Sequence, residues 1–169
     1  MQGAFREPAR RSYHTLIERE TARGVAGWSQ TIDFYAAIKR TLIEQAATVF
    51  LGLELDAGLR ERFVQSFAAM LTAALTPLHL DLPGTTWRRG LRARRWLAGL
   101  LAREAPRRVG SDAHDLFTQL CNTKDEQGNG FDADEAVDHA IFVLLAAHDT
   151  SATALSTLID ALVGDHDLQ

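Results

Sequence analysis

The sequence predicts an all-α protein of about six helices that end in one long central helix. Three observations favour this class. Apolar residues recur at helical spacing, no stretch alternates strictly between apolar and polar residues, and residues 133–163 contain neither proline nor glycine. The chain has 169 residues, of which 46% are hydrophobic, enough for one domain with a buried core. We therefore expect a single domain over residues 1–169.

The first two helices follow from their apolar faces. The first is expected from about Phe5 to Arg23, and Gly24 and Gly27 loosen its end. The second follows Trp28 and stops near Gly52. The predicted core-facing residues of the first are Ala9, Tyr13, Leu16 and Ile17. Those of the second are Tyr35, Ile38, Leu42, Ala46 and Val49.

The third helix has the most regular spacing, and its apolar face predicts contact with the core. That face comprises Phe63, Phe67, Met70, Leu71, Ala74 and Leu78. Residues 78–85 then form an apolar loop with a Pro-Gly turn, whose leucines we expect to cover another part of the protein.

An arginine-rich segment follows, with eight arginines between Arg88 and Arg108. Clustered positive charge is what phosphate binding needs. However, an apolar stripe at helical spacing places most of these arginines on the solvated face of an amphipathic helix, so we expect no nucleic-acid partner. The stripe comprises Ala93, Leu97, Leu100 and Leu101. Pro106 and Gly110 are expected to break the chain before a short helix from about Asp112 to Asn122.

The polar turn before the long helix partly resembles a calcium-binding loop. Asp125, Gln127, Asn129 and Gly130 fall on ligand and turn positions, but Ala136 stands where a bidentate glutamate is required. We interpret the segment as a turn without calcium. Asp132 and Glu135 are placed as a capping box.

The long helix, residues 133–163, interrupts its own apolar pattern. Ala140–Ala147 is apolar on every face, which predicts burial on all sides, and His148–Ser151 follows directly. An ionised, unpaired acid at this depth costs several kcal/mol. Asp149 could be paired with an arginine of the basic helix, while Thr150, Ser151 and Thr153 bond to carbonyls one turn earlier. Alternatively, Asp149 and Thr150 have a chemical task.

The run Ala146–Thr150 resembles the oxygen-activating helix of cytochromes P450, in which two small residues, any residue, an acid and a threonine follow one another. The polar turn, Trp28, the region around Gly52 and the loop 82–85 are also similar to this family in order and spacing. The resemblance covers essentially the whole chain. It implies a partial cytochrome P450 fold.

The resemblance implies a haem monooxygenase that inserts one oxygen atom from O2 into a hydrophobic small molecule such as a lipid, sterol or terpenoid. A ferredoxin or a reductase would donate the electrons. Asp149 and Thr150 would be catalytic and relay protons. Ala146, Ala147 and Thr150 would contact the haem, and Phe142, Leu145 and Ala146 the substrate. His148 is expected to be a polar or salt-bridging neighbour rather than a haem ligand.

The family's Glu-x-x-Arg helix, its haem-cysteine loop and an N-terminal part have no counterpart in the chain. Cys121 lacks the Phe and Gly context of the ligand cysteine, so we expect a buried structural thiol and no metal ligand. The chain alone is therefore expected to be inactive.

Few features of the sequence bear on location. The single cysteine, the absence of a signal-peptide pattern and an apolar run too short for a bilayer favour the cytoplasm, although a parent protein could carry an anchor. The alternative function is a non-enzymatic all-α domain that binds a ligand or a protein, with Asp149 purely structural.

Overall fold

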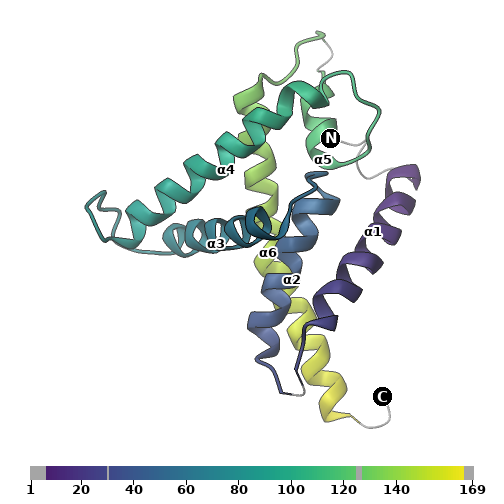
Figure 1. Cartoon of the computed structure of the whole chain (residues 1–169), viewed down its shortest axis with the longest axis vertical. Coiled ribbons are helices and arrows are strands. Elements are labelled where there is room, and N and C mark those ends of the chain that lie inside the picture. The colour runs from purple at the N-terminus through teal and green to yellow at the C-terminus, as the bar shows by residue number, and fades with distance from the viewer. Residues whose placement is uncertain (1–6, 30, 125–126, 166–169) are drawn as a thin grey trace.

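The computed structural model describes residues 7–29, 31–124 and 127–165, with side chains from residue 13 onward (Figure 1). Within these ranges the chain forms six helices and no strand, apart from one isolated bridge between Lys124 and Gly130. This confirms the all-α prediction. The helices are α1 (Glu7–Ala26), α2 (Phe34–Val49), α3 (Ala57–Ala74), α4 (Thr86–Arg108), α5 (Leu116–Asn122) and α6 (Ala133–Gly164).

Side-chain caps start helices α2 to α6. Each cap residue accepts a hydrogen bond from the backbone amide three residues later, which satisfies one of the free donors of the first turn. The caps of α2 to α6 are Asp33, Asp56, Thr85, Asp115 and Asp132. At α6 the predicted capping box is confirmed, because Glu135 also accepts from the amide of Asp132.

The core lies where α2, α3, α4, α5 and α6 meet, and residues of all five helices contribute to it. Helices α3 and α4 form an arm that extends away from α1 and α2 (Figure 1). They pack tightly at one crossing, because a Cβ atom added to Gly90 would lie only 2.1 Å from Cβ of Ala73. The largest side chains with almost no exposure are Phe63, Phe117, Leu51, Leu101, Leu116 and Leu120.

Most predicted faces are correct in part. Phe63, Phe67 and Met70 are buried on α3, whereas Leu78 lies beyond the helix and is 67% exposed. The predicted stripe of α2 is wrong at Tyr35, which is exposed. The buried residues of α2 are Thr41, Ile43, Ala47 and Val49, because α1, α3 and α6 all contact this helix and cover more than one face.

Three predicted boundaries shift. Helix α1 continues past Gly24 to Ala26, α4 contains Pro106 in its last turn, and α5 starts only at Leu116. A proline in the last turn removes one backbone donor but leaves the earlier hydrogen bonds in place. Phe5 and Asp125 lie outside the described residues, and so does the side chain of Ala9.

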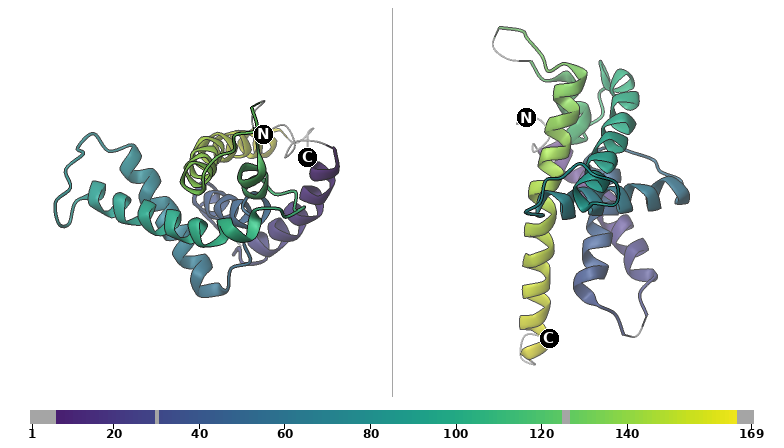
Figure 2. Two further views of the ribbon diagram at one scale, coloured as in Figure 1. Left: turned by 90° about the horizontal axis from the view of Figure 1, so that it is seen from above. Right: turned by 90° about the vertical axis from the view of Figure 1, so that its left-hand side faces the viewer.

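The apolar pattern of Ala140–Ala147 does not correspond to burial on all sides in this chain, because one side of α6 stays uncovered. Phe142 is 68% exposed, and Ala146 and Ala147 are exposed as well. Figure 2 shows why: α6 runs along one edge of the molecule, and the other helices cover only the side of α6 that faces them. The buried residues of α6 are Ala136, Val137, Ala140, Ile141, Leu144, His148 and Ala152.

By length and composition, α6 is also long and apolar enough to cross a membrane, and 22% of its most apolar 18 residues are buried in the fold. This differs from the expectation drawn from the short apolar run. Core helices of proteins in water share this length and composition.

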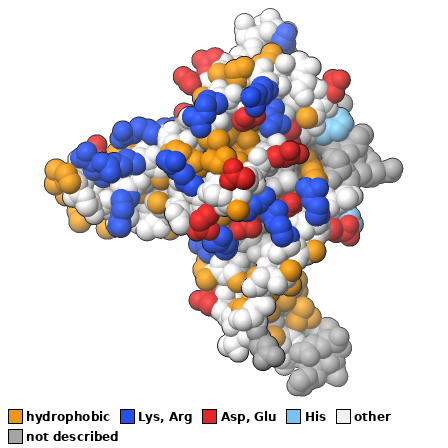
Figure 3. All heavy atoms as spheres, in the orientation of Figure 1, with side chains coloured by type: hydrophobic (Ala, Val, Ile, Leu, Met, Phe, Trp, Pro, Cys, Tyr) orange, Lys and Arg blue, Asp and Glu red, His pale blue; other side chains and the backbone are white. Residues whose placement is uncertain are grey.

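The basic helix is amphipathic as predicted. Ala93, Leu97, Leu100 and Leu101 are buried, and most arginines face solvent (Figure 3). Arg108 is different, because it donates to the carbonyl of Gly52 at 2.8 Å and lies 3.3 Å from Oδ2 of Asp115. It therefore ties the end of α4 to the α2–α3 connection and to the start of α5.

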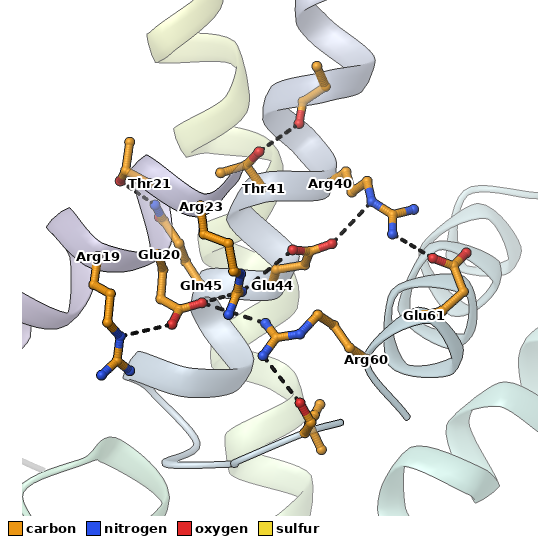
Figure 4. A network of polar contacts seen from close by, with 12 residues as sticks. Arg19, Glu20, Thr21, Arg23, Arg40, Thr41, Glu44, Gln45, Arg60 and Glu61 are labelled. Atoms are coloured by element: carbon orange, nitrogen blue, oxygen red, sulfur yellow. Dashed lines mark hydrogen bonds and ion pairs between the residues drawn. The ribbon is translucent and has the colours of Figure 1, made fainter. Parts of the chain in front are cut away.

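A network of ion pairs joins α1, α2 and α3 (Figure 4). Its centre is Glu20, which is 4% exposed and pairs with Arg19 and Arg23 of its own helix and with Arg60 of α3. Arg40 extends the network from α2 to Glu61, whose pKa it lowers mainly through their hydrogen bond. The network connects the outer helix α1 to the rest of the fold.

Candidate functional site

Asp149 is ion-paired within the fold. Its Oδ1 lies 2.8 Å from Nζ of Lys39, which α2 contributes. The pairing itself matches one of the two readings of the sequence, but the partner is a lysine of α2 rather than an arginine of α4. The hydrogen bond that Lys39 donates to Asp149 is the main cause that raises the pKa of Lys39, so the lysine stays charged. The ion pair thereby holds the carboxylate of Asp149 against α2.

Thr150 lies on the exposed side of the same helix. Its hydroxyl donates to the carbonyls of Ala146, at 3.1 Å, and of Ala147, at 3.0 Å. This is the back-bonding that threonine makes inside a helix, and it matches the structural reading for this residue. The hydroxyl is at the surface, so rotation about χ1 can redirect its proton to a group placed against this face.

His148 points the other way, into the core. The residue is 6% exposed, and its ring packs edge-on against Phe67 with centroids 5.4 Å apart. Burial is the main cause that lowers its pKa, the charge of Lys39 lowers it further, and Asp149 opposes both. The imidazole is therefore neutral near pH 7 and is a packed core residue. Its Nε2 has no hydrogen-bond partner among the described residues, so no salt bridge forms at this nitrogen.

The exposed face of α6 carries small side chains at the motif. Phe142, Ala146 and Thr150 are spaced four residues apart, so they lie on one face of the helix, and all three are exposed. Ala147 is exposed beside them. A flat ligand could therefore approach the backbone of α6 closely at Ala146 and Ala147.

An apolar cavity of about 270 Å³ lies between α3, α4 and α6. Leu145, predicted to contact substrate, lines this cavity. Phe142 and Ala146 do not line it and remain on the exposed face. The lining residues are Met70, Ala73, Ala74, His79, Trp87, Gly90, Leu91, Arg94, Ile141 and Leu145.

The sequence analysis named no residue of α3 or α4 as part of this cavity. Their apolar residues have the same helical spacing as core residues, and only the crossing of the two helices leaves a space between them. Trp87 is the one local signal, since its indole N–H needs a polar environment although it lies next to an apolar stripe.

Cys121 lies half-buried on α5 and packs against the core. Burial is the main cause that raises the pKa of its thiol, which disfavours the thiolate that binds metals. This agrees with the expected structural role. Among the described residues, no three His, Cys, Asp or Glu side chains are grouped as a metal site.

Comparison with protein-family models finds no match. Known proteins do match. Cytochrome P450 136 of Mycobacterium tuberculosis is 32% identical over 175 aligned positions that cover 100% of this chain and 36% of that protein. Ent-kaurenoic acid oxidase of Oryza sativa is 28% identical over 152 positions, which cover 83% of this chain and 30% of the oxidase. The chain thus spans about a third of the length of these relatives.

Two solved structures share the fold. A cyanobacterial CYP120A1 with bound retinoic acid superposes with a TM-score of 0.78 at 23% identity, and covers 94% of this chain and 37% of that one. The open form of cytochrome P450 EryK from S. erythraea gives a TM-score of 0.64 at 19% identity, with 96% of this chain and 42% of that one covered. The helices therefore share the fold found in part of such structures.

Proposed function

The chain belongs to the cytochrome P450 family, and from this premise we propose that it supplies the oxygen-activating helix and part of the substrate wall of a haem monooxygenase. The proposed reaction inserts one oxygen atom from O2 into a hydrophobic small molecule, with a ferredoxin or a reductase as electron donor. The observation that carries this proposal is the uncovered face of small residues on α6 beside the paired carboxylate of Asp149.

The residues of this face fit a flat macrocycle. Ala146 and Ala147 are exposed and carry only methyl side chains, so a ring system can lie close to the backbone. We assign haem contact to Ala146, Ala147 and Thr150. When bound, haem supplies the activation of O2.

Thr150 is proposed to hold a proton for that chemistry at Oγ1. In the structure its hydroxyl donates to two carbonyls of its own helix. Both are within one turn, so breaking them costs only modest hydrogen-bond energy at an exposed site. The hydroxyl can then donate toward the face of α6 where Ala146 lies.

Asp149 is proposed to deliver protons to Thr150 from solvent. Its side chain is 38% exposed, so water reaches it, and it is adjacent in sequence to the hydroxyl that it would serve. Lys39 orients the carboxylate through their 2.8 Å contact. Uptake of a proton at Asp149 requires this contact to loosen, so Lys39 would act as a positioning residue.

The cavity that Leu145 lines is the proposed substrate wall within this chain. Its lining is mainly apolar, which suits a lipid, sterol or terpenoid. Two relatives support this class by their names, one an oxidase of ent-kaurenoic acid and one a structure with retinoic acid bound. Phe142 and Ala146 are proposed to contact the part of the substrate that lies over the haem.

The chain alone is proposed to bind haem weakly, without thiolate ligation, and not to turn over substrate. Its only cysteine, Cys121 of α5, packs against the hydrophobic core, and burial raises the pKa of its thiol. We also propose a cytoplasmic location, because the N-terminal half of α6 packs against α4 and α5 rather than standing free.

Haem titration of matched tryptophan variants tests the proposed face. Ala146→Trp places a large ring on it, whereas Ala161→Trp places the same ring at another exposed alanine about 22 Å along the same helix. We expect Ala146→Trp to weaken haem binding about tenfold or more and Ala161→Trp to leave it within about twofold. Equal effects of the two substitutions, or none, would contradict the assignment.

A further inference from the structure

The cavity between α3, α4 and α6 has an unequal distribution of polar groups. Most of its lining is apolar, and the polar side chains among its lining residues are His79, Trp87 and Arg94. None of the lining side chains is acidic. Trp87 and Arg94 are pure donors, and a neutral histidine has one donor nitrogen. The polar part of the wall therefore matches an acceptor or an anion.

These three residues lie on one side of the cavity. His79 comes from the α3–α4 loop and stacks on Trp87 with ring centroids 4.2 Å apart, tilted by 35°. Arg94 lies seven residues after Trp87 on α4, and two helical turns place both side chains on the same face. Leu145 and Ile141 of α6 form the apolar wall.

Arg94 has hydrogen-bonding capacity left. In the described part of the chain its one hydrogen-bond acceptor is Oδ1 of Asp138, at 2.8 Å from Nη2. A guanidinium carries five N–H donors, so several of them remain for a ligand. Asp138 is not among the residues that line the cavity, so it orients Arg94 from outside.

We infer that this cavity selects an apolar molecule with a carboxylate, whose acid group binds Arg94 near Trp87 and whose tail lies along Ile141 and Leu145. The inference rests on the proposed function, since it names the substrate class of the same wall. Planar guanidinium and carboxylate groups match in a two-pronged hydrogen bond. The tail would bury its surface against α6, which leads it toward the motif that starts one residue after Leu145.

Three probes with twelve-carbon chains and different head groups test this inference on the 169-residue chain: dodecanoate, dodecanol and dodecyltrimethylammonium. Each displaces a fluorescent dansyl-labelled undecanoic acid, and the apparent dissociation constants are compared. We expect dodecanoate to bind about tenfold more tightly than dodecanol, because a hydrogen bond to a charged group contributes more than a neutral one. The ammonium probe is expected to bind most weakly.

Substitutions on α4 assign the preference to one residue. Arg94→Gln is expected to bring dodecanoate within about twofold of dodecanol, and Arg94→Lys to keep part of the preference. Arg95→Gln is the matched control, since this exposed neighbour does not line the cavity and its loss changes net charge equally. Circular dichroism confirms that each variant keeps its helix content.

Ala74→Trp separates this cavity from the exposed face of α6. Ala74 lines the cavity but is exposed, so a large ring there fills the space without displacing the core. We expect displaceable probe binding to disappear in this variant. If dodecanoate and dodecanol bind equally and neither binds to Ala74→Trp, the carboxylate preference is wrong. The proposal that this cavity is the substrate wall is then still supported. If none of the probes binds in a way that Ala74→Trp affects, the proposed substrate wall fails as well.

Discussion

Nζ of Lys39 and Oδ1 of Asp149 lie 2.8 Å apart, and this contact joins α2 to the middle of α6. The two residues are 110 positions apart in sequence and belong to helices that pack against each other. The acid of the motif is therefore held from the side of α6 that the fold covers, while the threonine beside it faces outward.

Breaking this pair is expected to cost little stability. Both side chains are partly exposed, so solvent screens their attraction. We expect Asp149→Asn and Lys39→Gln each to lower the free energy of unfolding by about 0.5–1 kcal/mol, with a coupling of similar size in the double variant. Urea denaturation of the parent chain, the two single variants and the double variant measures these free energies. A coupling near zero would mean that the two side chains do not interact in solution.

His148 makes stability depend on pH. Burial lowers the pKa of the folded imidazole below the ordinary 6.5, so the unfolded chain takes up the proton first as the pH falls. The contribution of His148 is complete above pH 6.5, and it is lost as the pH drops from there to the lower pKa of the folded state. Unfolding free energies at about pH 7.5 and about pH 5 should therefore differ less in His148→Gln than in the parent chain. His14→Gln, an exposed control, should keep the full difference.

Alanine substitutions at two glycines of α4 should change the stability in opposite directions. At Gly90 a methyl group would lie 2.1 Å from Cβ of Ala73, so Gly90→Ala must push α3 and α4 apart and is expected to cost about 1–3 kcal/mol. At Gly99 the nearest atom is the flexible end of Arg103 at 3.7 Å, so Gly99→Ala is expected to add up to about 1 kcal/mol through helix propensity. Thermal unfolding of both variants checks the pair. A Gly90→Ala variant as stable as the parent would contradict this crossing.

Arg108 and its neighbour Arg107 should behave very differently. Arg108→Gln leaves the carboxylate of Asp115, which is 8% exposed, without its cation, and also removes the contact to Gly52. We expect a loss of about 2–3 kcal/mol. Arg107 is 77% exposed on its side chain, so Arg107→Gln should change stability by less than about 0.5 kcal/mol. Similar losses of stability for both variants would argue against the contacts of Arg108 with Asp115 and Gly52.

The uncovered face of α6 should bind apolar dyes. Phe142 is 68% and Val163 67% exposed, at two ends of a face that no other described helix covers. We expect 1-anilinonaphthalene-8-sulfonate to fluoresce with the chain, and Phe142→Ser to reduce the signal by about half. Replacing Tyr35, an exposed aromatic residue on α2, by serine should leave most of it. Absence of dye binding would show that this face is covered in solution.

Much of the fold followed from local pattern. The stripe of Ala93, Leu97 and Leu101 and the cap at Asp132 each predicted a helix or its start, and both are confirmed. Such features depend on interactions within one or two helical turns, which a sequence displays directly. Errors arose where more than one neighbour covers a helix, as at the unpredicted buried residues Thr41 and Ile43 of α2, and where none does, as at Phe142 on α6.

The site divides in the same way. The order of residues in Ala146–Thr150 sufficed to indicate the family and to single out Asp149, because the motif is contiguous. That Lys39 holds this acid, that His148 packs on Phe67 and that Leu145 meets Trp87 and Arg94 in one cavity depended on helix crossings. Sequence determines which face of a helix is apolar, since that follows from a fixed rotation per residue. Which helix meets that face is decided only when all six pack around a common core, because the choice depends on the shapes of surfaces distant in the chain.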